Sequence, residues 1–160
     1  MKNSYRIILL SVLIWCAAIL AAPLLASVGS GSGNVVYRFF STICHQFDER
    51  SLHLFGFKLA VCARCSGIYF GFLVGAIIFP ISPKSFSAHG RFWLIVSVTP
   101  MSLDVLLSVA GIHGANIATR LTSGLFFGII SALVLMPSMI DGLVELKGML
   151  SNLKLRLYRA

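Results

Sequence analysis

The sequence predicts an all-α integral membrane protein, a bundle of four transmembrane helices in a single membrane domain over residues 1–160. Of its 160 residues, 58% are hydrophobic and only 11% are charged, whereas soluble domains carry about 25% charged residues. The apolar residues form four stretches, each near the roughly 20 residues that a helix needs to cross a bilayer. Segments of this length in lipid must satisfy their own backbone polar groups, and helices do so.

The predicted spans cover residues 7–28, 65–83, 92–112 and 121–140, and Asp104 is the only charged residue within them. Residues 29–64 form an outer loop, in which residues 35–46 have the apolar face of a short interfacial helix. Residues 142–159 place leucines at steps of three and four between basic residues. This pattern predicts an amphipathic tail helix on the inner leaflet.

The net charge of +8 comes from basic residues that flank the spans. Their position favours contact with the lipid bilayer and its anionic headgroups, and no nucleic-acid motif accompanies them. With a cytoplasmic N-terminus, eight of the thirteen basic residues lie inside the cell. The positive-inside rule therefore predicts a multi-pass protein of the cell membrane with both termini cytoplasmic and the loop extracytoplasmic. Residues 1–29 also have features of a signal peptide, but their long apolar run favours an uncleaved helix.

Small residues repeat every four positions in the second and fourth spans. Such a stripe allows another helix backbone to approach closely. The two helices are therefore expected to meet each other, or to bind a second copy or another membrane protein. The residues are Gly67, Gly71, Gly75, Gly124, Gly128 and Ala132.

Three of the four cysteines gather at the predicted outer end of the bundle. Cys62 and Cys65 have the spacing that lets two thiolates hold one ion, and Cys44 is a third candidate. His45 is the expected fourth ligand, with His53 and His113 as alternatives, and thiolate-rich sites suit zinc or iron. Cys16 lies alone in the first span and is interpreted as a small buried hydrophobe.

The same cysteines permit two other functions. A CxxC pair at a helix start favours a thiolate, so Cys62 and Cys65 could serve a membrane thiol–disulfide oxidoreductase coupled to quinone. This arrangement resembles the quinone-linked disulfide-forming enzymes of the disulfide-bond protein B and vitamin K epoxide reductase types. Those enzymes carry a second cysteine pair, whereas only Cys44 remains here. Alternatively, a disulfide staples the loop of a structural or assembly subunit.

Further polar residues are predicted at the same end of the bundle, so the sequence leaves open whether the protein is an enzyme. Asp104 is ionisable within a span, which by itself suggests a function or an ion pair with Arg64 or Arg120. The candidate catalytic or substrate-facing residues are Glu49, Arg50, Asp104, Asn116 and Arg120.

These motifs resemble a bacterial family of small membrane proteins, domain-of-unknown-function family 2085. The resemblance rests on the runs Cys44-His45-Gln46, Glu49-Arg50 and Cys62 to Gly71, and on Asp104, Asn116, Arg120, Gly124 and Gly128. It covers roughly residues 35–130. It departs from the family pattern at Asp48, Val105 and Ser123. The resemblance implies that these residues form one unit, and it implies no activity.

Overall fold

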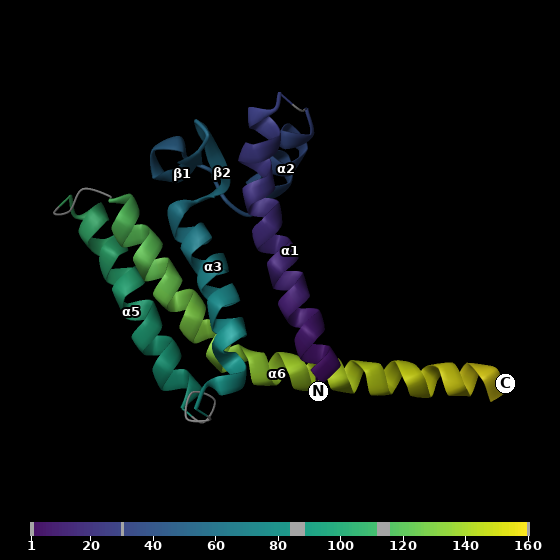
Figure 1. Ribbon diagram of the computed structural model, residues 1–160. Coiled ribbons are helices and arrows are strands. Elements are labelled where there is room, and N and C mark those ends of the chain that lie inside the picture. The colour runs from purple at the N-terminus through teal and green to yellow at the C-terminus, as the bar shows by residue number, and fades with distance from the viewer. Residues whose placement is uncertain (1, 30, 84–88, 112–115, 160) are drawn as a thin grey trace.

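Within the described residues, the computed structural model contains four helices that are long and apolar enough to cross a membrane, as the sequence predicted (Figure 1). They are α1 (Lys2–Ser27), α3 (Ala63–Ile78), α5 (Gly90–Val109) and α6 (Ile117–Arg159). A short 3-10 turn, η2 (Phe79–Ile81), extends α3. The structure describes residues 2–29, 31–83, 89–111 and 116–159, with side chains up to residue 150.

The loop between the first two spans is more ordered than the sequence predicted. Helix α2 covers Ser32–Ser41 and ends before Gln46. A 3-10 turn, η1 (Asp48–Arg50), then leads into an antiparallel hairpin of β1 (Ser51–Leu54) and β2 (Phe57–Cys62). Phe55 and Gly56 both have positive φ, at 54° and 81°, which suits the tight turn of a two-residue hairpin. Apolar residues alternate with polar ones on either side of this turn, a pattern that indicates strands.

Helices α3 and α6 pack along their glycine stripes, which confirms that the second and fourth spans meet. A Cβ added at Gly75 would lie 2.6 Å from the carbonyl oxygen of Ile129, and one at Gly128 would lie 2.8 Å from the backbone nitrogen of Phe72. Both distances are shorter than a Cβ tolerates. The close approach of the two backbones therefore depends on residues without a side chain.

Helix α6 joins the predicted fourth span and the predicted tail into one element. Figure 1 shows that it changes direction partway and that its C-terminal part runs across the end of the bundle where α1 begins. Pro137 lies inside the helix, and a proline removes a backbone hydrogen bond and bends a helix. On either side of Pro137, Met136 and Ile140 are buried with Ile8 and Ala76. The start of α1, the end of α3 and the middle of α6 therefore share one core.

A second core lies at the opposite end of α1 and determines where the cysteines meet. Ile19 of α1, Phe40 of α2, Val61 of β2 and Cys44 are buried together, with Trp15 packed edge-on against Phe40 at 5.2 Å between ring centres. Figure 1 shows the hairpin, α2 and the tops of α3, α5 and α6 at this end, away from both chain termini. The fold therefore gathers the polar residues at one end of the bundle.

Candidate functional site

The sulfur atoms of Cys44, Cys62 and Cys65 form one cluster, in which all three lie within 4.8 Å of one another. Cys62 ends β2, Cys65 lies in the first turn of α3, and Cys44 lies in the segment after α2. The Cys62 and Cys65 sulfurs are 3.5 Å apart, and the Cys62 backbone N–H donates to the Cys44 sulfur at 3.2 Å. All three are free thiols.

Gln46 holds the segment that carries Cys44 against the hairpin. Its side-chain amide donates to the carbonyl oxygens of Tyr37 at 2.8 Å and Ala60 at 2.7 Å. The Lys58 ammonium donates to the Gln46 carbonyl at 3.0 Å. Gln46 has a φ of 51°, a conformation that non-glycine residues seldom adopt, so these bonds hold an otherwise unfavourable turn. The sequence pattern indicated no such role for Gln46, because the carbonyl groups that its side chain contacts belong to other segments of the chain.

The surroundings of Cys62 favour its thiolate. A hydrogen bond with the Cys65 side chain lowers the pKa of the Cys62 thiol to about 5, against the opposing effect of burial. The backbone N–H groups of Cys65 and Arg64 and the Cys44 side chain lower this pKa further. A thiolate is the form that binds a metal ion and also the form that attacks a disulfide.

The cysteines line a cavity of about 260 Å³ that is also lined by basic side chains. Arg64 comes from the first turn of α3, Arg120 from the first turn of α6, and Arg50 from the 3-10 turn before the hairpin. The Arg50 guanidinium lies over the Phe47 ring, 5.4 Å from its centre. Arg120 is 8% exposed.

The predicted histidine ligands lie outside the sulfur cluster in the described part of the chain. His45 is exposed and lines the same cavity, and its ring stacks on Phe47 at 5.7 Å. His53 contacts the Asp48 carboxylate at 3.3 Å on the hairpin. His113 lies outside the described residues. Glu49 is exposed on the 3-10 turn and is absent from the residues that line the cavity.

Of the remaining candidate residues, Asp104 and Arg120 lie beside the cavity, and Asn116 lies at the start of α6. The Arg64 guanidinium forms an ion pair with Asp104, whose side chain is 13% exposed. Arg120 instead reaches the Ser108 hydroxyl, at 3.4 Å. The Asn116 side chain accepts a hydrogen bond from the Ala118 backbone N–H at 3.0 Å, so it caps the start of α6.

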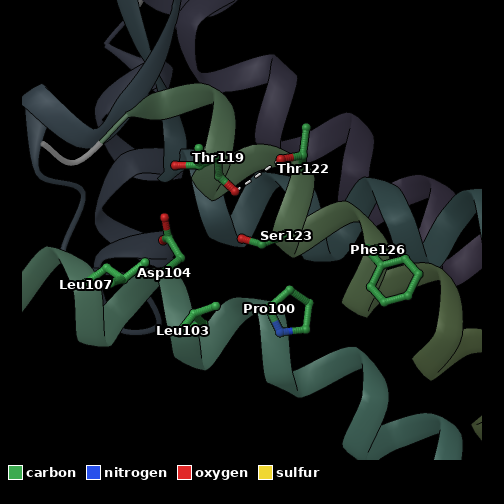
Figure 2. Close-up of a pocket in the computed structure, with 8 residues that line it drawn as sticks. All are labelled: Pro100, Leu103, Asp104, Leu107, Thr119, Thr122, Ser123 and Phe126. Atoms are coloured by element: carbon green, nitrogen blue, oxygen red, sulfur yellow. Dashed lines mark hydrogen bonds between the residues drawn. The ribbon is translucent and has the colours of Figure 1, made fainter. Parts of the chain in front are cut away.

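Asp104 also borders an apolar groove of about 530 Å³ between α5 and α6. Figure 2 shows its carboxylate directed toward α6, with Leu103 and Pro100 further along α5. Thr119, Thr122, Ser123 and Phe126 form the α6 wall. The Arg64–Asp104 ion pair therefore lies where the apolar groove and the basic cavity meet.

Fold and site together define a multi-pass membrane protein with a cluster of three thiols at one end of its helix bundle. The chain belongs to the predicted membrane proteins of domain-of-unknown-function family 2085, which matches residues 44–134. That segment contains all three site cysteines and the five glycines of the two stripes, so the family resemblance inferred from the motifs is confirmed.

Two archaeal relatives extend the match. An uncharacterized protein of Methanocaldococcus jannaschii is 37% identical over 145 residues, covering 86% of this chain and 93% of the relative. An uncharacterized protein of Methanothermobacter thermautotrophicus is 30% identical over 90 residues, covering 56% of this chain and 81% of the relative. The family is therefore not confined to bacteria. No solved structure matches the chain.

Proposed function

We propose that the protein is a membrane metal-binding protein in which Cys44, Cys62 and Cys65 hold one zinc or iron ion as thiolates. The observation that carries this proposal is the convergence of the three sulfurs to within 4.8 Å of one another. Cys44 and Cys62 are 18 residues apart in the chain, so the CxxC spacing alone does not account for the cluster. Thiolate-rich ligand sets favour zinc or iron over magnesium or calcium.

The sulfur positions fit a tetrahedral ion. A zinc–sulfur bond of about 2.3 Å requires sulfurs roughly 3.8 Å apart in tetrahedral geometry. The Cys62–Cys65 separation of 3.5 Å is close to this value, and the full set spans at most 4.8 Å. A small inward rotation of the side chains would complete three bonds.

His45 is our proposed fourth ligand. It follows Cys44 directly, lines the same cavity and is exposed, so its ring is free to rotate away from Phe47. Without His45 in place, three protein ligands would leave one position open, as in catalytic metal sites. We place the ion at the extracytoplasmic end of the bundle, following the orientation that the basic residues predict.

A thiol–disulfide oxidoreductase is the second candidate, and the Cys62–Cys65 distance of 3.5 Å favours it. Oxidation would form one sulfur–sulfur bond from two thiols and would transfer two electrons and two protons to a quinone, giving the quinol. Cys44 lies close enough to be the third thiol in exchange. A metal ion on the same three sulfurs would block this chemistry.

The deciding experiment is the metal content of detergent-purified protein, measured by elemental mass spectrometry. We expect about one zinc or iron per chain, and loss of the ion in the Cys62→Ser, Cys65→Ser double variant. Cys16→Ser is the matched control, since Cys16 is a buried cysteine of α1 outside the sulfur cluster. This control should retain the metal.

Protein purified without chelator that contains no metal would overturn the metal proposal. Reduction of a quinone by the dithiol form, lost in the same double variant, would then support the oxidoreductase. An inert Cys62–Cys65 disulfide together with a co-purifying membrane protein would instead indicate a structural or assembly subunit.

A further inference from the structure

Three guanidinium groups converge on a second cavity beside the thiol cluster. Arg50, Arg64 and Arg120 line a space of about 270 Å³, together with Ser108 and two valines of α5. The same three arginines line the thiol cavity, so the two spaces adjoin. Among the described residues that line the second cavity, none is acidic.

The arginines keep hydrogen-bonding capacity unused. Arg120 is 8% exposed. Its guanidinium donates a long hydrogen bond, 3.4 Å, to the Ser108 hydroxyl. The Nε atoms of Arg120 and Arg64 are both buried without a hydrogen-bond partner among the described residues. Burial of a cation without compensation is costly, and one acid, Asp104, pairs with Arg64. The described lining of the cavity therefore carries three guanidinium groups and buried donors that have no partner among the described residues.

We propose that this cavity binds an oxyanion of the phosphate type. Guanidinium groups donate paired, planar hydrogen bonds that match phosphate oxygens, and Arg120 is the buried anchor of the site. The Ser108 hydroxyl supplies a further donor from α5. Arg50 is exposed and held over the Phe47 ring, so it is placed to close over the anion from the hairpin side. This site is additional to the metal site and does not require a metal to be bound.

The phosphate group could belong to a free ion or to a lipid headgroup. Asp104 pairs with Arg64 and also borders the apolar groove between α5 and α6. The groove therefore meets the arginine site at this ion pair, between two membrane-spanning helices. A free phosphate and a lipid phosphate present the same oxygens to the arginines. The experiment has one arm for each source.

In the first arm, equilibrium dialysis of delipidated protein in detergent measures the binding of radiolabelled inorganic phosphate. In the second arm, native mass spectrometry compares retention of phosphatidylglycerol with that of phosphatidylcholine. We expect about one phosphate group per chain in at least one arm. Arg120→Gln and Arg50→Gln should each weaken binding about tenfold or more, the loss typical of a charged hydrogen bond.

Arg38→Gln is the matched control, because Arg38 is an exposed arginine of α2 outside the cavity, and it should change binding less than twofold. Arg50 is exposed, so its variant tests the site even where Arg120→Gln prevents folding. Binding of phosphate by the Cys62→Ser, Cys65→Ser variant would support the anion site even where the metal proposal fails. No binding in either arm, or binding unchanged in both arginine variants, would overturn the proposal.

Discussion

At the scale of single residues, the thiol cluster depends on a residue outside it that holds the cysteine-bearing segments in place. The CxxC pair brings Cys62 and Cys65 together by local geometry at a helix start, which is why sequence alone predicted them as a pair. Cys44 joins the pair because its segment is fastened to α2 and β2. The Gln46 side chain makes these hydrogen bonds, to Tyr37 and Ala60. Its partners could not be inferred from the residues next to it in the chain.

We predict that Gln46→Ala disorganises the site while the bundle stays folded. The variant loses two hydrogen bonds of about 1 kcal/mol each, and the Cys44 segment should become mobile. Hydrogen exchange of residues 42–47 should accelerate, and zinc affinity should fall about tenfold. Ser41→Ala, which removes only a local bond to the Arg38 carbonyl, is the control. Unchanged exchange in Gln46→Ala would refute this role whether or not a metal binds.

At the scale of secondary-structure elements, the α3–α6 pair determines the spacing of the site. Arg64 and Cys65 lie at the start of α3, and Arg120 lies at the start of α6. The glycine stripes bring these two helices into backbone contact, so they also bring the thiols and the arginines to adjoining cavities. The spacing of four was visible in the sequence, and the structure bears out the first of the two contacts that it predicted, the one between the two helices.

Gly128→Ala should destabilise the protein. The new methyl group would fall against the Ile68 carbonyl and lie 2.8 Å from the Phe72 nitrogen, and overpacking of this kind costs about 1–3 kcal/mol. Gly142→Ala is a matched control on the same helix, because a Cβ there has no atom within 4 Å, and alanine favours helices. Thermal unfolding followed by tryptophan fluorescence should show a lower Tm for the first variant only. Equal Tm values would contradict the packing described.

At the scale of the whole molecule, the site lies at the end of the bundle opposite the N-terminus and the C-terminal part of α6 (Figure 1). The four candidate spans would return the chain to its starting side, and we therefore predict both termini on one side of the membrane. The basic residues predict that this side is the cytoplasm. The metal and anion sites would then face the exterior.

This orientation predicts a difference in labelling between two engineered cysteines. Phe55 at the hairpin turn and Lys147 on the C-terminal part of α6 are both exposed. In intact cells, a membrane-impermeant maleimide should label Phe55→Cys above the wild-type background. Lys147→Cys, on the basic face of the helix, should be labelled only after the cells are permeabilised. The reverse pattern would place the thiol site in the cytoplasm.

The sequence by itself determined the membrane class, the four candidate spans and the family, because these depend on composition, local periodicity and short motifs. It predicted that the glycine-rich helices pack closely, and the tertiary structure decided that they pack on each other. It also predicted that the three cysteines and the polar residues share one end of the bundle. It did not predict the hairpin at residues 51–62, the continuous α6, the pairing of Arg64 rather than Arg120 with Asp104, or the role of Gln46. Those features depend on contacts between segments far apart in the chain, which the tertiary packing alone decides.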